Sequence, residues 1–127
     1  MVEFAYTTPI ILLLFISVVL LSFMLYSFVT LSHGAREGAR YVVGDPQATD
    51  AEVTAYIKTK LGLLDSNRVI FDIDPPVSER LPQGYITVRV SYPFQLVNVY
   101  IPYIISPGGI NLFPPVMLNG VSSMYLD

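Results

Sequence analysis

The sequence predicts an α+β fold in which a long hydrophobic N-terminal helix precedes a short amphipathic helix and a small, mainly antiparallel β-sheet. Three observations support this prediction. Phe4 to Ala35 contains no charged residue. An amphipathic stretch with a helix-capping pattern follows near residue 50, and two later segments alternate apolar and polar residues. We therefore expect a helical stalk, residues 1–44, that carries a small head, residues 45–127.

The first helix exceeds the ~20 residues that cross the hydrocarbon core of a bilayer. It lacks a basic start and a small-residue cleavage pattern, so we expect it to be retained and not removed as a secretory signal. Helix-forming residues continue from Pro9 to about Val43, roughly 50 Å, so the part after Ser32 should protrude from the bilayer. Gly44 and the proline two residues later should end the helix. If residues before Pro9 are also helical, we expect an irregularity there.

Small residues mark the foot of this helix. Gly34 and Gly38 lie one turn apart, and alanines flank them, which leaves a flat strip that another element can approach closely. Two interpretations are open. The strip packs against the chain's own sheet, which we favour, or it forms a crossing with a second copy.

The charged residues at the same level form a predicted collar between stalk and head. Arg36 and Arg40 lie one turn apart, and Glu37 is within reach of Arg40 and of His33. This collar is either solvated or headgroup-facing, or it makes salt bridges between subunits. We include Tyr41 in the collar.

The head begins with a second helix. Thr49 and Glu52 have capping-box spacing, apolar residues recur at three and four positions through Leu61, and Gly62 should stop the helix. Residues 68–74 alternate Val, Phe and Ile onto one face and end at two prolines, and residues 85–92 show the same period. Both segments are predicted strands.

The last third of the chain, residues 90–126, is free of charge and repeatedly interrupted by proline and glycine. Its longest apolar run, Leu96 to Ile105, is too short for a second membrane helix and contains Pro102. We expect short strands here, one near Pro115 to Asn119 and another at residues 121–126. Neighbouring subunits would cover the apolar surface that so small a head leaves exposed.

Composition excludes several functions. Seven Lys and Arg against ten Asp and Glu give a net charge of −3 without a basic run, so nucleic acid is not an expected partner. The chain has no cysteine and one histidine, so it has few of the side chains that usually act in catalysis or bind metals and cofactors. We predict a non-enzymatic protein without a cofactor. The acidic residues lack the spacing of a calcium loop and are expected to be solvated loop and cap residues: Asp45, Asp50, Glu52, Asp65, Asp72 and Asp74.

Two motifs resemble a known family. Val2-Glu3-Phe4-Ala5, followed by Pro9 and an aliphatic run, and Ala35-Arg-Glu-Gly-Ala-Arg-Tyr41 are similar to TadE-like pilins, relatives of type IV pilins in the tight-adherence (Tad) pilus system. The strand around Val88 to Phe94 fits as well. The resemblance implies a pilin-like lollipop fold and an inner-membrane precursor that a prepilin peptidase cleaves. It also implies assembly through the N-terminal helix.

Glu3 is the only charged residue before Arg36, at the edge of a segment where an unpaired carboxylate is costly. The resemblance implies that it pairs with the N-terminal amine, at Met1 here, of an adjacent subunit and so sets axial register. The alternative is a first-turn acid favoured by the helix dipole or lying among headgroups. Type IV pilin relatives usually carry this glutamate at the fifth mature position, and no basic leader ending in glycine precedes it here. Either the numbering starts at a mature or truncated end, or the processing site differs.

The function that the sequence predicts is a structural subunit of an extracellular pilus, with copies of itself, other pilins and an inner-membrane assembly platform as partners. The residues expected to pack in the filament core are Phe4, Pro9, Leu13, Val19 and Phe23. The alternatives are a minor pseudopilin that primes or caps assembly, and a membrane-anchored envelope binding module. The arginines after the span would place the head in the cytoplasm by the positive-inside rule, whereas the resemblance places it outside.

Overall fold

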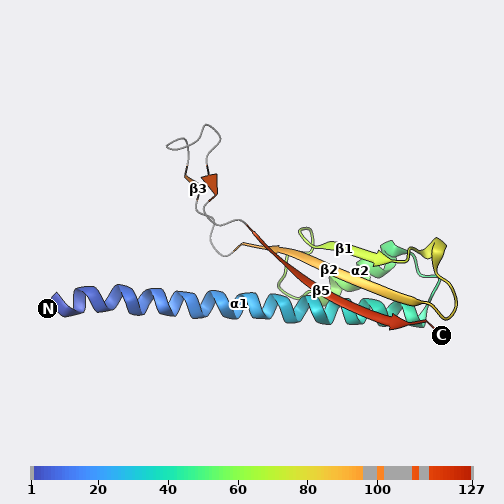
Figure 1. The fold of residues 1–127 in the computed structure, drawn as a ribbon, viewed down its shortest axis with the longest axis horizontal. Coiled ribbons are helices and arrows are strands. Elements are labelled where there is room, and N and C mark those ends of the chain that lie inside the picture. Colours follow the sequence, from blue (N-terminus) through green and yellow to red (C-terminus); the bar gives the residue numbers. More distant parts are fainter. Residues whose placement is uncertain (1, 96–99, 102–109, 112–114, 127) are drawn as a thin grey trace.

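The computed structural model describes residues 2–95, 100–101, 110–111 and 115–126, with side chains described for 2–95 and 115–126. The elements are helices α1 (Val2–Gly44) and α2 (Asp50–Lys60), strand β1 (Ile70–Asp74), a 3-10 turn (Val77–Glu79), and strands β2 (Tyr85–Phe94), β3 (Tyr100–Ile101), β4 (Ile110–Asn111) and β5 (Val116–Tyr125). The head lies along the C-terminal half of α1, and the N-terminal half extends beyond it (Figure 1). This is the predicted α+β arrangement.

Helix α1 is continuous over 43 residues and contains Pro9. It therefore includes the residues before Pro9 and spans about 65 Å at ~1.5 Å per residue. Proline at position 9 has no N–H to donate to the carbonyl of Ala5. The predicted end is confirmed, because the helix stops at Gly44.

Helix α2 begins at the predicted capping box. The Thr49 amide donates to Glu52 Oε2 at 2.8 Å, and the Glu52 amide donates to Thr49 Oγ1 at 3.3 Å. These two reciprocal bonds satisfy backbone donors that the first turn of a helix otherwise leaves free. The helix ends before Gly62, whose φ of +61° is a conformation that glycine adopts readily.

Strands β1, β2 and β5 form an antiparallel sheet with β2 in the centre. Both predicted strands are confirmed, and β2 continues two residues further, to Phe94. Ile86, Val88 and Val90 are fully buried on the inner face of β2. The outer face is more polar, and there Thr87 and Ser123 hydrogen-bond across β2 and β5 at 2.9 Å.

The predicted division of the tail into two strands is wrong. A single strand, β5, runs from Val116 to Tyr125 and pairs with the full length of β2. Gly120 lies in its middle, where a Cβ would come within 2.5 Å of the Leu31 backbone. The glycine does not break the strand but allows it to cross α1 at close range.

Strands β3 and β4 pair antiparallel in a separate two-stranded sheet. They lie in the excursion between β2 and β5, away from the three-stranded sheet (Figure 1). Most of the predicted apolar run Leu96 to Ile105 falls outside the described residues, as does the interval between β3 and β4.

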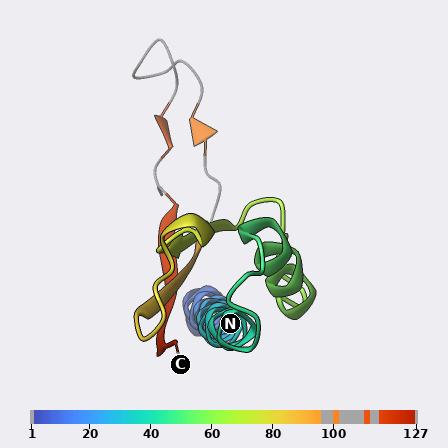
Figure 2. The same cartoon turned by 90° about the vertical axis from the view of Figure 1, so that its right-hand side faces the viewer.

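The core forms where α1 lies between the sheet and α2 (Figure 2). Burial on α1 starts at Ser27, so the C-terminal half of the helix belongs to the packing of the head. Three elements contribute the fully buried side chains: Leu31, Ala35, Ala39 and Val42 from α1, Val53 and Ile57 from α2, and Ile86, Val88 and Val90 from β2.

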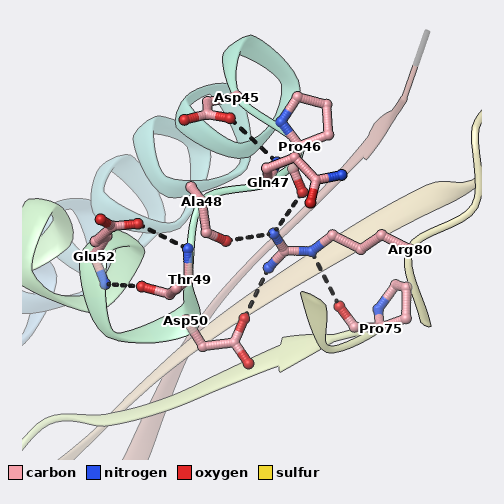
Figure 3. A network of polar contacts seen from close by, with 9 residues as sticks. All are labelled: Asp45, Pro46, Gln47, Ala48, Thr49, Asp50, Glu52, Pro75 and Arg80. Carbon is pink, nitrogen blue, oxygen red and sulfur yellow. Dashed lines mark hydrogen bonds and ion pairs between the residues drawn. The ribbon is translucent and has the colours of Figure 1, made fainter. Parts of the chain in front are cut away.

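Arg80 fixes the connection between the two helices (Figure 3). Its guanidinium donates to the carbonyls of Pro46 (3.2 Å), Ala48 (2.8 Å) and Pro75 (3.4 Å) and forms an ion pair with Asp50 at 2.8 Å. The side chain is only 3% exposed. Four contacts to a planar group explain why arginine suits this position, because a lysine ammonium cannot donate in so many directions within one plane.

Candidate functional site

The candidate functional site is the N-terminal half of α1, residues 2–23, which we call the free half-helix. Every side chain in it is exposed except Leu20, which is half-buried. It is apolar around its whole circumference, unlike a helix that packs one face on a core. Within the part of the chain that the structure describes, α1 is the one helix long and apolar enough to cross a membrane.

All five residues predicted to pack in a filament core lie on the free half-helix and are exposed: Phe4, Pro9, Leu13, Val19 and Phe23. The structure therefore leaves them available for an external partner, either lipid or another helix. Their role in packing stays a prediction.

The serine and threonine hydroxyl groups of the free half-helix are satisfied within the helix itself. Thr7, Thr8, Ser17 and Ser22 each donate to the backbone carbonyl four residues earlier, at 2.7–2.9 Å. A polar group taken out of water without a partner costs free energy, and these bonds remove most of that cost. The segment is thus suited to an environment without water.

Glu3 lies in the first turn of α1 and is exposed. The ion pairs among the described residues are those of Arg80 with Asp50 and of Arg89 with Asp72, so no described residue pairs with Glu3. Met1 lies outside the described residues, and its predicted pairing with Glu3 remains a prediction. A carboxylate in the first turn also interacts favourably with the helix dipole.

Tyr6 lies near the start and Tyr26 toward the end of the exposed apolar part of α1, and sequence reasoning missed both. They are 20 residues apart, which places them about 30 Å apart along the axis, the thickness of the hydrocarbon core. Tyrosine is enriched at membrane–water interfaces, where its ring and its hydroxyl meet different environments. The signal available from the sequence was the spacing of these tyrosines within the charge-free run.

The small residues of the collar pack against α2 more closely than against the sheet. A Cβ on Gly38 would lie 2.5 Å from Ile57 Cδ1 and 3.4 Å from Val88 Cγ1, and one on Gly34 would lie 3.3 Å from Ile57 Cγ2. The favoured interpretation, contact with the sheet, is therefore corrected: the strip faces the chain's own head, but mainly through α2. Both glycines are buried there.

The charged residues of the collar do not form the ion pairs that their spacing suggested. Glu37 Oε2 instead accepts a hydrogen bond from the Tyr56 hydroxyl at 3.4 Å. Tyr41 stacks on Tyr56 with ring centroids 4.8 Å apart. Arg36 and Arg40 are exposed, and the ion pairs among the described residues do not include them. The aromatic stack and the Tyr56–Glu37 hydrogen bond, not a salt bridge, are the contacts that these collar residues make with α2.

The described residues contain no group of three acidic or histidine side chains that could hold a metal ion. The six acidic residues considered for calcium are dispersed instead over caps, turns and strands. Asp50 pairs with Arg80, Glu52 caps α2, and the side chains of Asp45 and Asp65 each accept from the backbone amide two residues later. These contacts give the acids structural roles.

Comparison with known proteins places the similarity in the candidate site. Residues 1–40 match the family model described as TadE-like protein. No curated protein matches the chain, and no solved structure matches it. The matched residues comprise the free half-helix and most of the collar, and they agree with the family that the sequence motifs resemble. A TadE-like segment together with the long apolar helix fits a pilin-related protein.

Proposed function

Because residues 1–40 match TadE-like proteins, we propose that the chain is a structural subunit of a Tad-type pilus. It is inserted in the inner membrane as a precursor, cleaved by a prepilin peptidase, and assembled into an extracellular filament. The observation that carries this proposal is the free half-helix, an apolar surface that the head leaves uncovered.

In the membrane, lipid chains surround the free half-helix. In the filament, helices of other subunits replace the lipid. The segment is apolar around its circumference and its serine and threonine hydroxyl groups are bonded within the helix, so this exchange leaves none of those hydroxyl groups without a partner. The heads, each held on its stalk by the shared core, form the outer layer. Partners are copies of this chain, other pilins and the inner-membrane assembly platform.

Glu3 supports the proposal because it is the charge nearest to the end of the apolar surface. When helices pack side by side, a carboxylate needs an opposite charge, and the amine of a neighbouring subunit supplies one only at the correct axial offset. The pair then selects one register among many that apolar packing alone would permit.

A swap of the free half-helix tests the proposal against a membrane-anchored binding module. Residues 2–23 are replaced by an unrelated apolar transmembrane sequence that leaves the head unchanged. A pilin loses filament formation although the protein still enters the membrane, whereas an anchored module keeps its function. Filaments are counted by negative-stain electron microscopy, and membrane insertion is measured by fractionation. Normal filaments from the swapped chain would refute the proposal.

A minor pseudopilin that primes or caps assembly is the second candidate within the family. The same free half-helix serves it, so abundance separates the two. A main subunit makes up most of the filament mass, whereas a minor one is found at a tip or is absent.

A further inference from the structure

A hydrophobic loop lies where the free half-helix meets the head. Leu63, in the loop after α2, is 86% exposed although it lies directly beside α1. Between the two is an apolar groove of about 350 Å³, lined by Val18, Val19, Ser22, Phe23, Tyr26 and Leu63. The exposed surface of the free half-helix thus continues onto the head without interruption.

The loop is held at a fixed place on α1. Gly62 adopts a φ of +61°, and a Cβ there would lie 2.8 Å from the Tyr26 hydroxyl oxygen. The amide of Leu63 approaches the same oxygen at 3.5 Å. The position of Leu63 along the stalk is therefore tied to the position of Tyr26.

The spacing of Tyr6 and Tyr26 would place this position at the edge of the hydrocarbon core. When Tyr6 and Tyr26 lie at the two interfaces, the groove, which reaches back to Val18, falls in the last turns inside the apolar region. Leu63 then points into the outer acyl chains, an environment in which its exposure to water disappears.

The charges of the head are distributed in a way that fits the same orientation. Residues 58–68, next to the groove, carry Lys58, Lys60 and Arg68 with Asp65 as the single acid. The opposite end of the head, residues 45–52 and 74–80, carries five acids and one arginine. Anionic lipid headgroups attract the first end and repel the second.

We propose that in the membrane-inserted precursor the loop at Leu63 lies on the bilayer and seats the head at a fixed height above it. The occupant of the groove is lipid. Three observations support lipid over a second copy of the chain: the match between the Tyr6–Tyr26 spacing and the bilayer, the continuity with the free half-helix, and the basic residues at this end. This inference depends on the proposed membrane precursor.

Tryptophan fluorescence tests the inference cleanly because the chain contains no tryptophan. Three single variants of the full chain are reconstituted in vesicles of phosphatidylcholine and phosphatidylglycerol. Phe15→Trp reports the middle of the free half-helix, Leu63→Trp the loop, and Leu81→Trp the opposite end of the head. All three positions are exposed, so the substitutions leave the core intact. Brominated lipids quench from either the shallow or the deep part of the acyl chain.

We expect deep bromines to quench Phe15→Trp most, shallow bromines to quench Leu63→Trp most, and neither to quench Leu81→Trp. If Phe15→Trp is quenched and Leu63→Trp is not, the inference fails while membrane insertion stands. If Leu63→Trp escapes quenching at high protein-to-lipid ratio and its emission shifts to the red on dilution, a second copy covers the groove and the inference also fails. If Phe15→Trp is not quenched, insertion itself is refuted, and the proposed precursor with it.

Discussion

Replacing Gly120 with alanine should loosen the head from its stalk. The added Cβ would lie 2.5 Å from the carbonyl carbon and oxygen of Leu31 and 2.6 Å from the amide nitrogen of Ser32. These are backbone atoms inside α1, so no side chain can rotate away to make room. Strand β5 and α1 must therefore separate by roughly 1 Å, the gap between these distances and ordinary van der Waals contact.

The expected cost follows from two opposing effects. Overpacking of a core typically costs about 1–3 kcal/mol, and a rigid backbone neighbour favours the upper end of that range. Replacing glycine also removes unfolded-state freedom, which stabilises by about 0.4–1 kcal/mol. The net loss is about 2 kcal/mol, which lowers the melting temperature of a head of about 85 residues by roughly 8–16 °C.

The assay is thermal unfolding of the full chain in detergent, followed by near-ultraviolet circular dichroism of the tyrosines. The stacked pair Tyr41–Tyr56 and the edge-on pair Tyr85–Tyr125 both report the packing of the head. Gly44→Ala is the matched control, because an added Cβ there would meet no atom of another part of the structure within 4 Å, and the substitution should leave the melting temperature unchanged or raise it. Equal melting of Gly120→Ala and the unaltered chain would refute the close crossing of β5 and α1.

Three further substitutions test the head and the stalk. Arg80→Met should destabilise the head by about 2 kcal/mol, because it leaves the part-buried carbonyls of Ala48 and Pro75 without their donor. The control is Arg89→Met, because Arg89 is exposed and its ion pair with Asp72 is 3.9 Å long; this substitution should change stability by less than about 0.5 kcal/mol. Equal losses of stability for Arg80→Met and Arg89→Met in the same melting assay would contradict the prediction. Thr49→Ala removes the cap of α2 and should cost about 1 kcal/mol, so the amides in the first turn of α2 should exchange faster with solvent. Unchanged or slower exchange of these amides would contradict this prediction. Glu3→Ala should enter the membrane normally yet reduce filament yield by roughly tenfold, which corresponds to about 1.4 kcal/mol per contact. The control Glu3→Asp keeps the charge and should retain more of the yield. A normal filament yield from Glu3→Ala would rule out the register role of Glu3.

The features that could be predicted from the sequence are those encoded by neighbouring residues. The capping box at Thr49, the alternation through Val88 and the uncharged run after Glu3 each act within a few residues, and each has its expected structure. The similarity to TadE-like proteins also lies in local motifs within residues 1–40.

The features that sequence reasoning missed depend on distant partners. Gly120 looked like a strand break, yet its meaning comes from Leu31, nearly 90 residues earlier in the chain. Leu118, Gly120 and Ser122 continue a single alternation, a signal that could have indicated one strand. Arg80 had no distinguishing pattern, because its acceptors at Pro46 and Ala48 approach it only after the chain has folded.

Quantitative mass spectrometry of surface filaments, purified from cells that produce this chain, tests the central claim most directly. The account predicts that this chain is the most abundant protein in the filaments, with the free half-helix present in the assembled form. Filaments that contain the chain only in trace amounts would assign it the minor role. Filaments that lack it altogether would contradict its proposed place in the pilus.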